Sequence, residues 1–182
     1  MGSSIRRRAG HPGVPVTTHA LVDASGRVGF SAAVTDLRIE QADGEAALQD
    51  WQRVHNLIIP AASSVLSLDE VRERAGRNRL YVAYLGDVLV GCSTVRPPTG
   101  DNGSTATVIA RILPERRGQG LGGQLYAQGL AVARALGAEV VETVVLESNP
   151  EGLRFALAHG FVEIERYVLP GDSVAFIDLR LA

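Results

Sequence analysis

The chain divides into segments with two kinds of hydrophobic pattern. Several segments are β-branched runs or alternate apolar and polar residues with a period of two, which is typical of strands. Longer segments repeat their apolar residues with a period near 3.6, which is typical of helices. The expected strands are residues 36–40, 80–84, 88–95, 107–113, 140–146, 161–169 and 174–181, and the expected helices are 43–59, 67–74, 121–136 and 150–159.

Residues with side-chain oxygens mark the starts of the expected helices. Asp43 can cap the first helix, and Ser67 with Glu70 can form a capping box for the second. Asn149 can cap the last helix, with Pro150 at its first position, where a missing N–H does no harm.

A glycine-rich turn, residues 116–123, joins the expected strand 107–113 to the helix 121–136. Its sequence is Arg-Arg-Gly-Gln-Gly-Leu-Gly-Gly. The first N–H groups of a helix have no partner inside the helix and lie at the positive end of its dipole. Glycines leave these groups accessible, because no side chain covers them. The turn therefore predicts an anion site, most often for a phosphate or pyrophosphate.

The order of the elements, β-α-α-β-β-β-α-β-α-β-β, predicts an α/β fold of the α+β type in a single domain. Hairpins flank one strand–helix–strand unit, residues 107–146, so we expect a mixed central sheet, antiparallel at its ends and parallel at its centre. About six to seven strands and about four helices are expected. The glycine-rich turn belongs to this central unit, where ligands bind in open α/β sheets.

Length and composition fit one globular domain. The chain has 182 residues, and we expect the domain at residues 35–182, after an N-terminal extension, residues 1–34, that is partly disordered or forms a small hairpin. No segment reaches the length of a membrane span, no signal peptide is visible, and the single cysteine is Cys92, so we expect a cytoplasmic protein. A formal net charge of −2 argues against a nucleic-acid partner.

The basic residues exclude two kinds of chemistry. All 18 are arginine, and the chain has no lysine. A Walker-type nucleotide site needs a lysine on the phosphates, and a Schiff base needs a lysine amine, so neither is expected. The histidines and the cysteine do not have metal-ligand spacing, so no metal is expected.

Gly118, Gly120 and Gly123 match the G-x-G-x-x-G fingerprint of dinucleotide-binding proteins. In that fingerprint the first glycine follows the strand directly, whereas residues 114–117 lie between them here. A dinucleotide fold also needs several strand–helix–strand units. We therefore reject this interpretation.

The stretch Arg117-Gly118-Gln119-Gly120-Leu121-Gly122 resembles the coenzyme A signature, Gln/Arg-x-x-Gly-x-Gly/Ala, of the GNAT superfamily of acyl-CoA N-acyltransferases. Residues 149–161 resemble the second conserved segment of that family, and the order of elements is similar from about residue 35 onward. The resemblance implies splayed central strands. It also implies an acetyl-CoA-dependent N-acetyltransferase that acts on a primary amine of a small molecule or peptide by direct attack in a ternary complex.

The resemblance also implies where acetyl-CoA binds. The pyrophosphate of coenzyme A is expected on the main-chain N–H groups of the turn. The pantetheine arm is expected in the slot between the splayed strands 107–113 and 140–146, where a main-chain N–H polarises the thioester carbonyl. The expected cofactor-binding residues are Ile112, Leu113, Arg117, Gly118, Gln119, Gly120, Leu121, Gly122, Gly123 and Asn149.

One position departs from the family pattern. The family often has a tyrosine as general acid seven positions after the asparagine, and Ala156 stands there. The thiolate then leaves unassisted or through water, and the alternative is a non-catalytic acyl-CoA-binding or regulatory module. The candidates for the base are Glu142, Glu147, Ser148 and Tyr167, and strand alternation allows only one of the glutamates to line the site.

The resemblance implies where the acceptor amine binds, but the sequence does not identify the amine. It is expected between residues 60–66 and the turn 170–173. A homodimer is possible, and no nucleic acid or membrane is expected as a partner.

Overall fold

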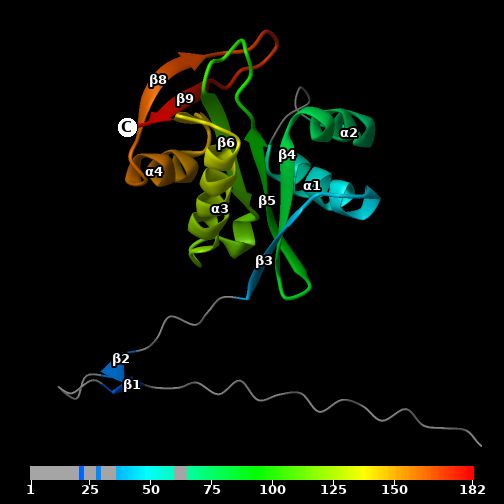
Figure 1. Cartoon of the computed structure of the whole chain (residues 1–182), viewed down its shortest axis with the longest axis vertical. Coiled ribbons are helices and arrows are strands. Elements are labelled where there is room, and N and C mark those ends of the chain that lie inside the picture. The colour runs from blue at the N-terminus through cyan, green and yellow to red at the C-terminus, as the bar shows by residue number, and fades with distance from the viewer. Residues whose placement is uncertain (1–20, 23–27, 30–35, 60–64) are drawn as a thin grey trace, which may run out of the picture. The chain divides into compact units, whose positions relative to one another are not determined.

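The computed structural model describes residues 21–22, 28–29, 36–59 and 65–182 (Figure 1). By its internal contacts the chain separates into two units, Met1–Thr35 and Asp36–Ala182. The first unit contains an antiparallel pair of short strands, β1 (Leu21–Val22) and β2 (Val28–Gly29). The disorder expected near the start of the chain falls on residues outside the described ones.

In the described part of the second unit, seven strands form one mixed sheet with the order β3-β4-β5-β6-β7-β9-β8. Only β6 and β7 are parallel neighbours, and the other pairs are antiparallel. The number of strands and the central parallel pair confirm the predicted fold class. The strands are β3 (Leu37–Gln41), β4 (Arg79–Leu85), β5 (Val88–Arg96), β6 (Thr105–Ile112), β7 (Val140–Leu146), β8 (Phe161–Tyr167) and β9 (Phe176–Leu181).

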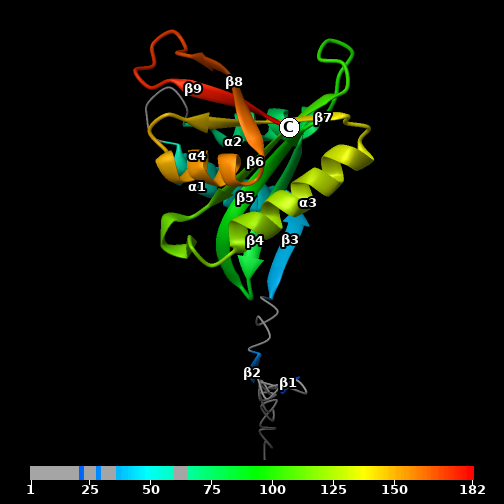
Figure 2. The same ribbon diagram turned by 90° about the vertical axis from the view of Figure 1, so that its left-hand side faces the viewer.

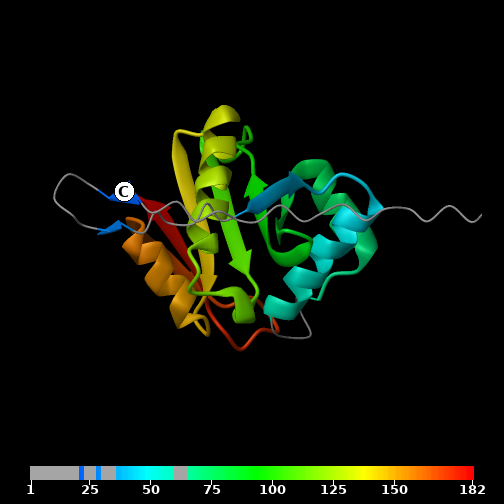
Figure 3. The same ribbon diagram turned by 90° about the horizontal axis from the view of Figure 1, so that it is seen from below.

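Helices cover both faces of this sheet. The helices α1 and α2 lie on one face, and α3 and α4 lie on the other (Figure 2, Figure 3). This arrangement follows from the crossovers, because β6–α3–β7 and β7–α4–β8 run in the same direction along the sheet. The described helices are α1 (Glu45–Ile58), α2 (Leu68–Arg77), α3 (Leu121–Ala135) and α4 (Pro150–Ala158).

Each face of the sheet has its own core. Against α3 and α4, the core includes Val108, Tyr126 and Ile177. Against α1 and α2, it includes Trp51 and Cys92. The indole N–H of the fully buried Trp51 donates to the main-chain oxygen of the β5 residue Ser93 at 2.9 Å, so a hydrogen bond as well as apolar packing holds α1 on the sheet.

The helix caps agree with the predictions at two of the three positions. Ser67 and Glu70 form the capping box of α2, and the Asn149 side chain accepts from the N–H of Gly152 at 3.0 Å. The prediction for Asp43 is wrong, because the residue at the start of α1 is Gly44 with φ 89°. A left-handed glycine turns the chain into the helix there without a side-chain cap.

The connection after β6 is more ordered than the sequence suggests. Pro114–Arg116 forms a turn of 3₁₀ helix, η1, between β6 and the glycine-rich turn. β6 therefore ends at Ile112, one residue earlier than expected. β8 and β9 are also shorter than predicted, and they leave residues 168–175 as their connection.

The strands β6 and β7 separate after a short paired segment. Their pairing runs from Thr105↔Val140 to Thr107↔Glu142, although β6 continues to Ile112 and β7 to Leu146. Beyond this segment β6 keeps β5 as a neighbour and β7 keeps β9. This geometry confirms the expected splay, and it leaves one edge of β6 without a partner strand.

Candidate functional site

The glycine-rich turn presents the start of α3 without side-chain cover. Gly118 and Gly120 have left-handed backbones, with φ 73° and φ 76°, and Gly120 is the N-cap of α3 without a side-chain hydrogen bond. A Cβ atom on either glycine would meet nothing within 4 Å. The first N–H groups of this 15-residue helix therefore face an open region, as an anion site requires.

Two cavities meet beside this turn. The first, here named the turn cavity, is about 440 Å³ and is lined by Arg116, Gly118 and residues 120–123. The second, here named the splay cavity, is about 250 Å³ and lies between residues 108–111 of β6 and 143–146 of β7. Residues shared by both cavities form their junction, and they are Ile58, Ala110, Arg111, Arg117, Asn149, Gly152 and Phe155.

The main chain of β6 offers hydrogen-bonding groups to the splay cavity. The N–H of Leu113 donates to the main-chain oxygen of Val90 at 2.9 Å, so it faces β5. In an antiparallel pair the N–H and C=O of successive residues point to alternate edges. The N–H and C=O groups of Ile112 and Ala110 therefore face the splay.

The structure gathers most of the predicted cofactor-binding residues around these cavities. Leu113 and Gln119 line neither cavity, and Leu113 is buried in the core against α1 and α2. The predicted residues that line the turn cavity are Ile112, Arg117, Gly118, Gly120, Leu121, Gly122, Gly123 and Asn149.

Arg117 is positioned by two contacts. Its Nε donates to the main-chain oxygen of Ile112 at 3.2 Å, and its Nη1 forms an ion pair with Glu151 at 2.8 Å. Both partners of the ion pair are partly exposed. Exposed ion pairs contribute little stability, so Arg117 can exchange Glu151 for a bound anion at low cost.

Of the four candidates for the catalytic base, Ser148 lines the splay cavity, whereas Glu142, Glu147 and Tyr167 line neither cavity. Glu142 accepts from Arg180 at 2.7 Å, and Glu147 forms an ion pair with Arg166. Glu147 follows the end of β7, so strand alternation does not decide which of the two glutamates lines the site. The ring of Tyr167 stacks on Phe176, which lines the splay cavity, with 5.8 Å between the ring centroids.

Tyr167 belongs to a pair that the sequence did not reveal. Its hydroxyl donates to Asp178 at 3.4 Å. Burial, followed by the negative charge of Glu142, raises the pKa of Asp178. Asp178 lines neither cavity, but a carboxyl group with a raised pKa is a candidate proton acceptor through the hydroxyl of Tyr167. The alternation of β9, Phe-Ile-Asp-Leu-Arg-Leu, was the available signal, because it places Asp178 opposite the buried Ile177 and Leu179.

Ala156 is buried and lines the splay cavity, and it faces a tyrosine from α3. Tyr126 lines the same cavity, its hydroxyl is buried, and that hydroxyl has no hydrogen-bond partner among the described residues. Burial raises the pKa of Tyr126 to about 12. The sequence predicts only a core residue here, because the helical period does not show that the hydroxyl reaches a cavity.

Cys92 and His55 are core residues. Cys92 is fully buried, and burial raises the pKa of its thiol to about 11, so it is not a nucleophile at neutral pH. His55 is buried and stacks on Trp51, with 5.0 Å between the ring centroids.

Two further properties concern only the part of the chain that the structure describes. No group of three or more His, Cys, Asp or Glu side chains there could hold a metal ion. None of the helices there combines the length and the apolar character needed to cross a membrane.

Comparisons with known proteins agree with this geometry. The model of the acetyltransferase (GNAT) family matches residues 45–161. Among curated proteins, none matches the chain.

Solved structures share the fold over most of this chain. yncA from Salmonella typhimurium, solved with its cofactor acetyl-CoA, is 19% identical, with 80% of this chain and 92% of that chain covered and a TM-score of 0.64. A ribosomal-protein-alanine N-acetyltransferase from Brucella melitensis is 19% identical, with 79% and 98% covered and a TM-score of 0.63. A Bacillus subtilis acetyltransferase in complex with CoA is 22% identical, with 80% and 97% covered and a TM-score of 0.58.

Proposed function

Because this chain belongs to the GNAT acetyltransferase family, we propose that it is an acetyl-CoA-dependent N-acetyltransferase that acts on a primary amine. Membership of the family makes the chain an acyltransferase. The identity of the donor, the class of acceptor and the direct attack are our proposal. The observation that carries it is the unpaired edge of β6 beside the uncapped start of α3.

The glycine-rich turn and its arginines are our candidates for holding the diphosphate of coenzyme A. The N–H groups at the start of α3 supply hydrogen bonds and the positive end of the helix dipole. Arg116 and Arg117 line the turn cavity and add positive charge. The residues present therefore fit a diphosphate, and the glycines leave room for its close approach.

The splay is our candidate site for the pantetheine arm. An amide-containing chain can pair with an unpaired strand edge as an added strand would. The N–H groups of Ala110 and Ile112 face this space, and either can donate to the thioester carbonyl. Such a donor stabilises the negative charge that develops on the oxygen during attack by the amine.

The acceptor needs a group that removes a proton from its nitrogen. Among the predicted bases, Glu142 and Glu147 would each have to leave an arginine partner, and the hydroxyl of Ser148 is a weak base. Tyr167 is the better candidate, because it lies against the cavity residue Phe176 and its partner Asp178 has a raised pKa. In this scheme the amine attacks the thioester carbon, the C–S bond breaks, and the proton from nitrogen passes to the Tyr167–Asp178 pair.

The proposal is tested by binding and turnover on the same protein. Isothermal titration with acetyl-CoA should show saturable binding, and thiol release should depend on an added amine. Acetyl-CoA binding without thiol release on any amine would support the non-catalytic module instead. Binding of NAD in preference to coenzyme A would contradict both.

Gly120→Asp tests the anion site directly. The substitution places a carboxylate at the N-cap of α3 and forces a non-glycine residue into a left-handed backbone with φ 76°. We expect the Kd for acetyl-CoA to rise by about 10²-fold, from loss of dipole and hydrogen-bond interactions plus charge repulsion. Isothermal titration measures this change.

Gly86→Asp is the matched control. Gly86 has φ 59°, has nothing within 4 Å of a Cβ position, and lies in the β4–β5 turn away from both cavities. It should lose stability in the same way and keep the affinity for acetyl-CoA. An unchanged affinity in Gly120→Asp would show that the diphosphate does not bind at this turn.

A further inference from the structure

Arg111 is a partly buried arginine whose positive charge the proposed steps do not use. Its partner across the β5–β6 ladder is Cys92, which belongs to the core against α1 and α2, so the side chain of Arg111 lies on that face of the sheet. Its Nη1 atom is buried and has no hydrogen-bond partner among the described residues. Unsatisfied buried polar atoms are rare in native proteins and often belong to sites.

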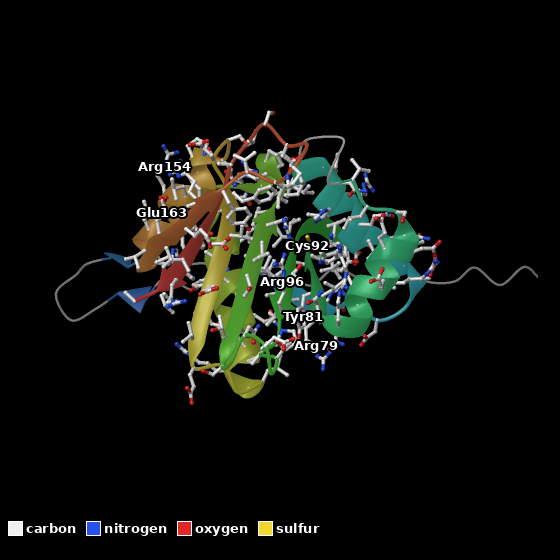
Figure 4. The ribbon with its side chains drawn as sticks, turned by 90° about the horizontal axis from the view of Figure 1, so that it is seen from above. Arg79, Tyr81, Cys92, Arg96, Arg154 and Glu163 are labelled. Atoms are coloured by element: carbon white, nitrogen blue, oxygen red, sulfur yellow. The ribbon has the colours of Figure 1, made fainter. Side chains whose placement is uncertain are left out.

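The neighbours of Arg111 increase the demand for negative charge. Burial has the largest effect on the pKa of Arg111 and lowers it; Cys92, through its charge and a hydrogen bond, acts in the opposite direction, and Arg96 at the end of β5 and Arg74 of α2 lower the pKa further. None of these three arginines forms an ion pair with a carboxylate in the described part of the chain. Arg96 and Cys92 lie in the middle of the sheet, away from Glu163 at its β8 edge (Figure 4).

The position of Arg111 connects this charge to the acceptor. Arg111 lines both cavities, so it lies at the junction where the thioester would meet the amine. Near this junction the splay cavity has an apolar lining that includes Ile58, Ile59 and Phe176. These surroundings suit a ligand with one anionic group and an apolar body, and they do not suit a polycation.

We propose that Arg111 binds a carboxylate of the acceptor, so that the acceptor is an amine that also carries a carboxylate, such as an apolar α-amino acid. A guanidinium group matches a carboxylate with two parallel hydrogen bonds. The inference rests on the proposed function, because it assigns the substrate class of the same site.

The experiment compares amines that differ only in the anionic group. L-Leucine and L-leucinamide, and L-methionine and L-methioninamide, are assayed by thiol release with saturating acetyl-CoA. The acids should have a kcat/KM at least tenfold higher than their amides, although the amino group of an amide is less basic and more of it is deprotonated. Binding of L-leucine to the CoA-saturated protein is measured in parallel by isothermal titration.

Arg111→Met should raise the KM for L-leucine by about 10²-fold, as expected for one partner of a desolvated charge pair. The kcat/KM for L-leucinamide and the Kd for acetyl-CoA should stay within about threefold. Arg111→Lys keeps the charge without the planar guanidinium group and should raise the KM for L-leucine by about tenfold. Arg134→Gln, at an exposed arginine on α3 that lines neither cavity, should match the wild type.

The outcomes separate this inference from the proposed function. Binding of L-leucine that Arg111→Met abolishes, without turnover of any amine, would support the anion site and contradict the acetyltransferase. A wild-type preference for the amides, or an equal loss with acids and amides in both Arg111 variants, would overturn the inference and leave the acetyltransferase standing. If neither variant folds, the wild-type comparison of acids with amides decides alone.

Discussion

The buried hydroxyl of Tyr126 has no hydrogen-bond partner among the described residues, and Tyr126 belongs to the same core as Ala156. It lines the splay cavity together with Ala156, and its pKa is raised to about 12. A thiol has a pKa of about 8.5, so complete proton transfer from Tyr126 to a leaving thiolate is unfavourable. Tyr126 is therefore suited to stabilise the leaving sulfur by a hydrogen bond, without releasing its proton.

Tyr126→Phe should lower kcat by about 10- to 100-fold, the value of one hydrogen bond to a charged group. The KM for acetyl-CoA should change little, because the bond strengthens as charge develops on sulfur. Since the hydroxyl stays protonated well below pH 12, the ratio of wild-type to variant kcat should be constant between about pH 6 and pH 10. Steady-state assays over this range measure it.

Tyr81→Phe is the control for that substitution. Tyr81 belongs to the same buried core but lines neither cavity. It should leave kcat unchanged. An equal kcat in Tyr126→Phe and the wild type would mean that sulfur leaves without help from Tyr126.

At this scale the sequence predicts the main chain better than the side chains. The spacing of Gly118 and Gly120 was enough to place the uncapped N–H groups, because only glycine adopts such backbones freely. Arg111 stands inside an apolar run, Ile-Ala-Arg-Ile-Leu, and nothing in that run shows that its charge is buried beside a cavity. That property depends on the splay and on α1, which are distant in the sequence.

The contact of α3 with β6 depends on a glycine in the middle of the helix. A Cβ atom at Gly129 would lie 2.5 Å from Cγ1 of Val108, which is a buried and β-branched residue. Because valine has a stiff side chain, it cannot move aside as a long chain could. Gly129 therefore lets the helix approach the strand that forms one wall of the splay.

Gly129→Ala should lower the free energy of unfolding by about 1–2 kcal/mol, since the overpacking penalty exceeds the gain in helix propensity. Thermal unfolding, followed by the fluorescence of the single tryptophan, Trp51, measures it. Gly123→Ala is the control in the same helix, because nothing lies within 4 Å of its Cβ position. It should stabilise the protein by about 0.5–1 kcal/mol, and a stabilising Gly129→Ala would show that the contact is looser than described.

Elements were predictable where a local pattern is sufficient. Periodicity located the helices and strands, and the capping box of α2 followed from Ser67 and Glu70 alone. The predicted N-cap of α1 was wrong because Asp43 and Gly44 are both favourable N-cap residues, and the sequence does not show which of them adopts the backbone angles of the cap. The 3₁₀ turn at Pro114–Arg116 has too few residues for any periodic signal.

The assembly of the whole molecule depends on pairings between distant segments. The strand β9 inserts between β7 and β8, although it follows β8 in the chain. Hydrophobic alternation in β9 cannot show which neighbours it chooses. The same reason hides the candidate site, because the ends of α1 and β6 and the start of α4 meet only in the folded chain.

Because β6 and β7 pair over only a short segment, few main-chain hydrogen bonds connect the two halves of the sheet. The main-chain link between the part from β3 to β6 and the part from β7 to β8 consists of three residue pairs, Thr105↔Val140 to Thr107↔Glu142, and the hydrogen bonds that Ser104 accepts beside them. A cosubstrate with amides along its length would then connect the two halves by hydrogen bonds in the splay. Acetyl-CoA should slow amide deuterium exchange at Ala110 and Ile112 more than in β4. Uniform slowing across the sheet would show that acetyl-CoA does not form hydrogen bonds with the free edge of β6.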